Sequence, residues 1–314
     1  MSKIGEKTVL ITGGTGMVGK SFPRKEGYVF VGSKDYDLKN VRSVKYMLLD
    51  HRPDVIIHLA ACVGGVKANT DYVGRFYSEN ILINHNVIHC ARDFDVKKVV
   101  SLLSTCIYPD AAYVKYPLTE DQIHNGPPHS SNFGYAYAKR MLDVQSRAYR
   151  KQYGCNYITT IPNNLFGKHD NFDLQNSHVL PAIIRKVYEA KKNNTQVVLW
   201  GDGSPLREFT YSNDLAEILL FLVENYNEPG PINVGNTKEI SIKQAAEMIA
   251  EIFKFHGEII WDTSKPSGQF RKPSDNSKLI ELGWKEEYYT DFYSALCEVC
   301  EWFEQNYPNV RLET

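Results

Sequence analysis

The stretch Thr8–Gly19 limits the possible fold more than any other segment of the chain. Thr8–Thr12 is an apolar run rich in β-branched residues, which predicts a strand, and a glycine-rich turn follows it directly. A strand, a glycine turn and a helix in this order bring backbone N–H groups close to a phosphate group. Glycine turns also form for purely geometric reasons, so the position of this one at the start of a strand–helix series carries the interpretation. The turn comprises Gly13, Gly14, Thr15, Gly16, Met17, Val18 and Gly19.

Strand and helix patterns alternate through the first half of the chain. Short apolar runs are followed by longer helical patterns, of which Tyr72–Phe94 and Tyr135–Tyr153 are the clearest. This alternation predicts an α/β fold with a doubly wound parallel sheet of the Rossmann type, which binds ligands at the carboxyl edge of its strands. The expected strands after the first are Tyr28–Gly32, Val55–Ala61, Val99–Ser104 and Tyr157–Asn164.

The pattern changes beyond Phe166, and a smaller α/β lobe is expected there. We assign residues 1–165 to a nucleotide-binding domain, completed by a helix and a strand at about residues 208–236. Residues 166–207 and 237–314 form the expected substrate-binding lobe. The sequence thus predicts two interleaved parts rather than two consecutive domains.

The first helix is expected to be unusually short. Only eight residues separate Gly19 from Tyr28, and Pro23 lies among them. Because proline inside a helix removes a hydrogen bond and clashes with the preceding turn, it ends the helix. We therefore predict no more than two turns, from about Met17 to near Pro23.

Composition excludes several classes of function. A formal net charge of −1 in 314 residues argues against nucleic acid as the main partner. We find no apolar run of membrane-spanning length and no signal-peptide core, and we interpret the protein as cytoplasmic, with six cysteine thiols. Cys297 and Cys300 form a lone Cys-x-x-Cys in a helical pattern, which favours core packing over a zinc site, and no metal is expected.

The end of the second strand predicts the cofactor. An acidic residue there binds the ribose 2′-hydroxyl of NAD, whereas Ser33 and Lys34 occupy this position. A 2′-phosphate is better tolerated beside them, which favours NADP(H). The alternative is that Lys34 is simply solvated.

Tyr135 and Lys139 lie four residues apart and therefore share one face of the predicted helix. A phenol beside an ammonium is expected to ionise more easily, and it can pass a proton to a carbonyl oxygen while hydride reaches the carbon. Ser104, at the end of a strand, is positioned to hold that oxygen. A surface helix pair is the alternative, but Ser104, the glycine turn and the Val63–Val66 loop converge on the same sheet edge.

Six short motifs, taken together, point to one family. They are Gly13–Gly19, Ser104-Thr105-Cys106, Tyr135–Lys139, Asn163-Asn164-Leu165-Phe166-Gly167, His169-Asp170-Asn171-Phe172 and His178-Val179-Leu180-Pro181. In these motifs the chain resembles the GDP-L-fucose synthases, which are bifunctional epimerase/reductases of the extended short-chain dehydrogenase class. The resemblance implies conversion of GDP-4-keto-6-deoxy-D-mannose to GDP-L-fucose with NADPH.

The resemblance also implies roles for individual residues. Ser104, Tyr135 and Lys139 would be the reductase group, and Cys106 with His178 the acid/base pair that inverts carbons 3 and 5. Without the family, Cys106 would be interpreted as a packed residue and His178 as a helix cap. The implied cofactor contacts, beyond the glycine turn, are Ser33, Lys34, Asp37, Leu38, Leu102, Leu103, Ser104, Thr105, Lys139, Pro162, Asn163, Asn164, Leu165 and His178.

Substrate contacts are implied at Lys186, Trp200, Arg207 and Ser267. Lys186 replaces an arginine of some members, and Ser267 replaces an acidic residue that we would expect to bind the nucleotide. The basic loop 265–272 is either a diphosphate clamp or a solvated loop. The family also implies a homodimer through the helices over 72–94 and 135–153, and Phe76, Ile81, Ile83, Val87 and Ile88 supply apolar side chains for it.

Three other functions remain as alternatives. A 4,6-dehydratase of this fold carries carboxylates where this chain has Thr105 and Cys106. A 4-epimerase would retain tightly bound NAD and would not need Cys106 and His178 as a pair. A non-catalytic NADP-sensing or nucleic-acid-binding relative typically loses the tyrosine or the lysine, and here both are present.

Overall fold

A six-stranded parallel sheet forms the centre of the protein. The computed structural model describes residues 7–265 and 270–312. Its central sheet has the strand order β2-β1-β3-β4-β5-β9, and every neighbouring pair is parallel. The doubly wound fold expected from the sequence is confirmed. The strands are β1 (Val9–Thr12), β2 (Tyr28–Val31), β3 (Val55–His58), β4 (Lys98–Leu102), β5 (Tyr157–Pro162) and β9 (Ile232–Val234).

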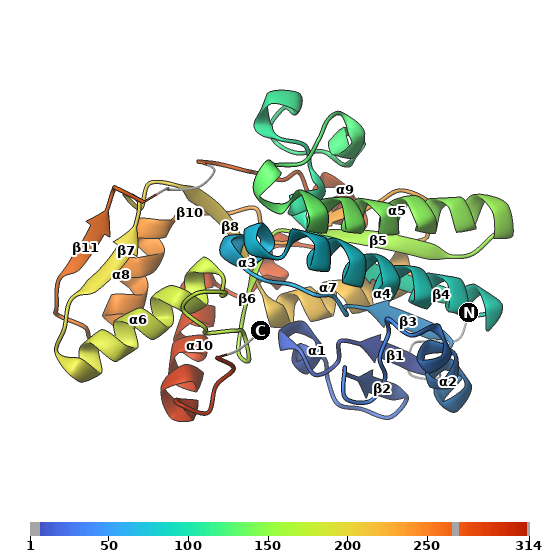
Figure 1. The fold of residues 1–314 in the computed structure, drawn as a ribbon, viewed down its shortest axis with the longest axis horizontal. Coiled ribbons are helices and arrows are strands. Elements are labelled where there is room, and N and C mark those ends of the chain that lie inside the picture. The colour runs from blue at the N-terminus through green and yellow to red at the C-terminus, as the bar shows by residue number, and fades with distance from the viewer. Residues whose placement is uncertain (1–6, 266–269, 313–314) are drawn as a thin grey trace.

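Both faces of this sheet are covered, because alternate side chains of each strand point to opposite faces. Leu10 and Ile56 pack beneath α2 (Val41–His51), α4 (Val73–Asp93) and α5 (Phe133–Tyr153). Ile11 and Ile57 pack with the opposite layer, formed by α1 (Met17–Ser21), α7 (Ser212–Asn225) and α9 (Ser277–Glu281). Figure 1 shows α4 and α5 running side by side across one face.

The shortened first helix is confirmed. Helix α1 has five residues and ends at Ser21, two positions before Pro23. Phe22 then leaves the helix with an extended backbone, and its side chain, 2% exposed, packs into the core under β1 and β2. This burial anchors the segment that would otherwise have continued as helix.

One expected helix is confirmed and one expected strand is divided. The helix expected over 72–94 is α4 (Val73–Asp93), and a short helix, α3 (Val66–Asp71), precedes it across Tyr72, whose backbone leaves the helical region with φ −120° and ψ 38°. The strand expected over 157–164 ends at Pro162, and β6 (Asn164–Phe166) belongs to another sheet. Asn163 lies at this break, where it accepts a 2.6 Å hydrogen bond from Thr210 and donates one of 2.8 Å to the Asn236 carbonyl.

The remaining elements build the lobe, which lies beside the sheet in Figure 1. Its core gathers Phe166, Phe172 and the inner faces of α6 (Val179–Asn193), α8 (Ile242–Ile252) and α10 (Phe292–Asn306). Two small sheets complete it, with strand orders β10-β8-β6 and β11-β7. Their strands are β7 (Val197–Trp200), β8 (Leu206–Tyr211), β10 (Glu239–Ser241) and β11 (Ile259–Asp262).

The chain crosses between the two halves several times. After β8 it returns to the central sheet as α7 and β9, and then leaves again for β10, α8 and β11. It returns once more as α9, where Leu279 and, just after the helix, Trp284 pack into the core on one face of the central sheet, and it ends in the lobe as α10. The short 3₁₀ turns are Thr105–Ile107, Ala111–Tyr113, Glu120–His124, Ser130–Asn132 and Glu286–Tyr288.

Within the described ranges, no helix has the length and apolar character needed to cross a bilayer. The same part of the chain contains no group of three histidine, cysteine, aspartate or glutamate side chains that could hold a metal ion. All six cysteines are free, as expected, and Cys300 packs in the lobe core.

Candidate active site

The glycine turn after β1 fits a dinucleotide phosphate because its backbone is bare and tightly folded. Gly13 has φ +70°, and a Cβ on it would lie 2.9 Å from the Ala60 nitrogen. A Cβ on Gly19 would lie 2.5 Å from the Gly14 Cα. Only glycine therefore allows the turn to close against β3 and α1, which leaves an open backbone surface at the carboxyl edge of the sheet.

The end of β2 lies against this turn. The Gly14 N–H donates to the Val31 carbonyl at 2.9 Å, and a Cβ on Gly32 would come within 2.5 Å of the Thr15 hydroxyl oxygen. Ser33 and Lys34 are exposed at the rim, whereas Leu38 is buried. Asp35 turns back and accepts a 2.8 Å hydrogen bond from the Gly32 N–H, so a carboxylate does lie near this strand end.

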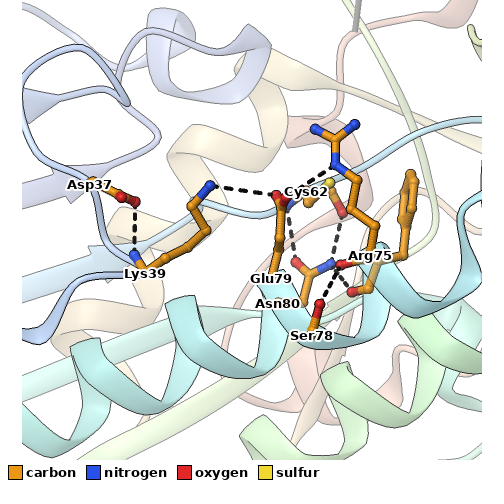
Figure 2. Close-up of polar contacts among 8 residues, drawn as sticks. Asp37, Lys39, Cys62, Arg75, Ser78, Glu79 and Asn80 are labelled. Carbon is orange, nitrogen blue, oxygen red and sulfur yellow. Dashed lines mark hydrogen bonds and ion pairs between the residues drawn. The ribbon is translucent and has the colours of Figure 1, made fainter.

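The loop after β3 is held in place by α4, as Figure 2 shows. The Asn80 side chain accepts from the Cys62 N–H at 3.0 Å and donates to the Cys62 carbonyl at 2.9 Å. Beside it, Glu79 accepts from Arg75 at 3.0 Å and lies 4.0 Å from the Lys39 ammonium. These contacts join the loops after β2 and β3 to one helix, and nothing in the sequence had singled out Asn80.

A buried polar chain fixes the ends of β1 and β3. The Thr12 hydroxyl lies 2.8 Å from His58 Nδ1, and His58 Nε2 lies 3.1 Å from the Asn84 amide oxygen. Burial and the nearby Lys139 ammonium lower the pKa of His58 to about 3, so the ring is neutral. A neutral imidazole that donates to Asn84 must accept from Thr12, which fixes its tautomer.

Lys139 is held rigidly beneath the site. Its ammonium donates a 2.7 Å hydrogen bond to the Leu102 carbonyl at the end of β4 and lies 5.9 Å from the centre of the Tyr135 ring. Burial lowers the pKa of Lys139 to about 7. The Lys139 side chain is almost completely buried, so its hydrogen bond to the Leu102 carbonyl is the main compensation for the lost hydration of the charge.

The pKa of the Tyr135 phenol is shifted in the opposite direction to the one expected. Burial raises the pKa of its phenol, Cys106 and Cys62 raise it further, and a hydrogen bond with Ser104 opposes them. The prediction of an easily ionised phenol is therefore wrong for the free protein. Desolvation disfavours the phenolate, and the Lys139 ammonium faces Leu102 instead of the phenol oxygen.

Ser104 and Cys106 are presented by the same 3₁₀ turn. The Ser104 hydroxyl caps this turn by accepting a 3.3 Å hydrogen bond from the Cys106 N–H. Both side chains are half-buried, and both interact with Tyr135. The structure thus brings together four of the five predicted catalytic residues at the end of β4.

His178 lies in the other half of the molecule. It is exposed at the N-cap of α6, and its segment is joined to the β3 loop where the Gly65 N–H donates to the Asn176 carbonyl at 2.8 Å. Asp170, only 7% exposed, lies in its electrostatic field. Burial raises the pKa of Asp170 to about 6, and His178 opposes that shift. Sequence reasoning quoted Asp170 within a motif but assigned it no role.

In the segment 162–165, a predicted cofactor contact, the side chains of Asn163 and Asn164 are already bonded to other parts of the protein. Pro162 and Asn163 are buried, and the Asn163 amide is bonded to Asn236 and Thr210. The Asn164 amide donates to the Glu208 carbonyl at 2.9 Å. Leu102, Leu103 and Thr105 are likewise buried at the strand end.

The predicted substrate residues line the lobe. The Lys186 ammonium donates to the Val198 carbonyl at 2.9 Å, and Trp200, at the end of the same strand, is 59% exposed. The Arg207 guanidinium donates to the Leu206 carbonyl at 2.7 Å, and burial lowers its pKa. Ser267 lies outside the described residues.

Lys272 connects these two groups of residues. Burial lowers the pKa of its ammonium, Cys106 opposes this shift and Arg207 adds to it, so the ammonium lies within electrostatic range of both residues. Its neighbour Pro273 accepts a 2.8 Å hydrogen bond from the Leu118 N–H, which holds the segment against the nucleotide half. The basic character of loop 265–272 was the only sequence signal for it.

Comparison with known proteins supports this arrangement. Residues 9–235 match the NAD dependent epimerase/dehydratase family. GDP-L-fucose synthase of Dictyostelium discoideum is 45% identical, over 98% of this chain and 98% of that protein. A probable GDP-L-fucose synthase of Drosophila melanogaster is 41% identical over 97% and 99%. The crystal structure of a GDP-L-fucose synthetase from Naegleria fowleri bound to NADP superposes with a TM-score of 0.92, at 42% identity, covering 99% of this chain and 96% of that one.

The parallel sheet and the bare glycine turn fit a dinucleotide-binding protein, and the relatives show that the chain is an NADP-dependent oxidoreductase. The relatives named above act within a smaller group of this class, the GDP-L-fucose synthases. The chain belongs to the NAD dependent epimerase/dehydratase family and, within it, to the GDP-L-fucose synthases.

Proposed function

We propose that this protein converts GDP-4-keto-6-deoxy-D-mannose to GDP-L-fucose by inverting carbons 3 and 5 and reducing carbon 4 with NADPH. The observation that carries the proposal is the gathering of Ser104, Cys106 and Tyr135 above Lys139, which is fixed to the Leu102 carbonyl. Full-length similarity to GDP-L-fucose synthases supports the substrate assignment.

The cofactor would be held by the backbone of Gly13–Gly19 and by the ends of β2, β4 and β5. When bound, NADPH supplies the hydride for carbon 4. The hydroxyl that can hold the keto oxygen is that of Ser104, which lies beside Tyr135. The two hydroxyl groups would therefore meet the substrate oxygen together.

Tyr135 acts as the general acid of the reduction. Because burial raises the pKa of its phenol, Tyr135 carries its proton at neutral pH and can donate it to the oxygen on carbon 4. Lys139, with a pKa lowered to about 7, can take up a proton as negative charge enters the site. The raised phenol pKa thus suits an acid better than the ionised form expected from the sequence.

Cys106 and His178 carry out the inversions. Protons next to the ketone are acidic, because the resulting enolate places its charge on the oxygen that Ser104 and Tyr135 hold. One residue removes a proton from carbon 3 or 5, and the other returns one to the opposite face. Asp170, near His178, is positioned to orient that ring.

The sugar nucleotide would bind along the lobe. Arg207 and Lys272 provide positive charge for the diphosphate, with Lys186 nearby on α6. The exposed ring of Trp200 offers an apolar face. In this scheme residues 1–165 and about 208–236 bind the cofactor, and residues 166–207 and 237–314 bind the substrate.

The protein is proposed to act as a homodimer in a reducing cytoplasm, which suits six free cysteines. Helices α4 and α5 expose apolar side chains over a groove of about 290 Å³. Phe76, Val87 and Ile88 are buried inside the subunit, whereas Ile81 lines the groove and Ile83 is half-buried. The exposed apolar side chains of the two helices include Tyr77, Leu82, Tyr137, Met141 and Val144. Sedimentation of a Met141→Glu variant tests the dimer, because a charge there should leave a folded monomer.

Incubation with GDP-4-keto-6-deoxy-D-mannose and NADPH, followed by NMR of the product, tests the proposed activity. We expect GDP-L-fucose and, when the reaction is run in D₂O, deuterium at carbons 3 and 5. A reduced product with neither carbon inverted would mean that the protein is a reductase without epimerase activity. Failure to oxidise NADPH would exclude the reductase as well.

A further inference from the structure

Arg24 lies against the glycine turn, and the sequence had assigned it no role. Its guanidinium donates long hydrogen bonds to the Gly14 and Gly19 carbonyls, at 3.3 and 3.4 Å. The guanidinium carbon also stacks 3.4 Å from the centre of the Phe30 ring on β2. The arginine reaches this position because α1 stops at Ser21 and the chain turns back toward β2.

The surroundings of Arg24 leave its charge without a carboxylate partner. In the described parts of the chain, its polar contacts are the two carbonyls, both made through one terminal nitrogen, and the residue is exposed. Stacking on Phe30 and bonding to carbonyls fix its orientation without neutralising it. The outer donors of the guanidinium are therefore available to an anion.

The glycine turn connects the Arg24 guanidinium to the expected ribose site at the end of β2. Gly14 is bonded to Val31, and Thr15 packs against the Gly32 backbone, so the turn and the strand end form one surface. In this class of fold an acidic residue at the strand end binds a 2′-hydroxyl, whereas a nearby arginine accommodates a 2′-phosphate. Here Asp35 supplies a carboxylate bonded to Gly32, and a phosphate beside it requires compensating positive charge.

We propose that Arg24 determines the preference for NADPH over NADH by binding the adenosine 2′-phosphate. The inference rests on the proposed use of NADPH and names the residue that recognises it. A planar guanidinium gives a phosphate two parallel donors, which exposed Lys34 cannot do. The shortened helix therefore supplies a cofactor contact instead of only removing buried surface.

Binding of adenosine 2′,5′-bisphosphate and of adenosine 5′-monophosphate, measured by calorimetry, tests the proposal without the reaction. In Arg24→Gln, the dissociation constant for the bisphosphate should rise about 10- to 100-fold, because a charge-assisted contact is lost. The constant for the monophosphate should change less than about twofold. Glutamine retains a donor for the Gly14 carbonyl, and the melting temperature without ligand checks that the turn is intact.

Lys25→Ala is the matched control, since Lys25 is also exposed and stacks over a ring, that of Tyr28, at 4.8 Å. It should leave both constants unchanged. Equal losses for the two ligands in Arg24→Gln would make Arg24 only a support for the turn and would overturn the proposal. A large loss in Lys34→Ala with none in Arg24→Gln would also overturn it. If the unmodified protein bound neither ligand, the proposed use of NADPH would itself fail.

Discussion

The groups assigned to reduction and those assigned to inversion are held in different ways. Ser104, Tyr135 and Lys139 all come from β4, its following turn and α5, and Lys139 is fixed to the backbone of β4. His178 is exposed at the start of α6 in the other half, beside a carboxylate, Asp170, that has one unpartnered oxygen. In the proposed mechanism, reduction thus depends on one rigid frame, whereas inversion depends on two halves keeping their relative position.

This difference predicts where each activity is vulnerable. Changes within the β4–α5 frame should affect reduction through the chemistry of single groups. Changes near α6 should affect inversion first and leave reduction of a correctly configured substrate largely intact. The following predictions test that separation in order of decreasing effect.

Tyr135→Phe should have the largest effect, because it removes the general acid from the frame. NADPH oxidation should fall about 10²- to 10⁴-fold, with cofactor affinity near that of the unmodified protein. Stopped-flow absorbance and a binding titration measure the two. Tyr137→Phe, on the exposed side of the same helix, is the control. Wild-type turnover in Tyr135→Phe would mean that another acid protonates the sugar.

Cys106→Ser and His178→Asn should separate the two chemistries. Each should slow deuterium exchange at carbons 3 and 5 by about 10²- to 10³-fold, because each removes one partner of the acid/base pair. NMR of the recovered substrate without NADPH measures the exchange. Cys62→Ser, a half-buried cysteine also near Tyr135, is the matched control. Normal exchange in both variants would remove the inversion from the proposed function.

Asp170→Asn should stabilise the fold and impair inversion. Burial raises the Asp170 pKa to about 6, so the folded state holds this proton more tightly than the unfolded chain, and stability is lost as pH rises from about 4 to 6. Above pH 6 the variant should gain up to about 2–3 kcal/mol relative to the unmodified protein, and near pH 4 this gain should vanish. Urea unfolding at both pH values measures it. A gain independent of pH would show that Asp170 does not titrate in this range.

Lys272→Ala should have the smallest of these effects. Losing one charge-assisted contact should raise KM for the sugar nucleotide about tenfold, with little change in cofactor binding. Lys265→Ala, in the same basic loop, is the control, and steady-state kinetics measure both. Equal effects in the two variants would mean that the loop acts only through its overall charge.

The sequence predicted the elements whose cause is local. The glycine turn, the five-residue helix before Pro23 and the shared face of Tyr135 and Lys139 follow from backbone and spacing rules. The change of sheet at Asn163 did not, because hydrogen bonds join Asn163 to Thr210 and Asn236, which are distant in the sequence. The raised pKa of the Tyr135 phenol also escaped prediction, because it comes mainly from burial, which depends on the whole fold.

Residues without a conspicuous motif were also missed. Arg24, Asn80 and Lys272 act through what the fold brings near them, and each lies apart in sequence from its counterpart. Asp170 was visible within a motif, but its burial could not be read from composition. The sequence therefore predicted where the site lies on the sheet better than it predicted the residues that hold the site in place.

The repeated crossing of the chain between its halves has a consequence for the history of the protein. Neither the half built around the central sheet nor the lobe corresponds to one continuous stretch of the gene, because α7, β9 and α9 return to the first half after the lobe has begun. A single crossover between two relatives would therefore combine segments of both parents within a core. Neither half can be exchanged intact in one such event.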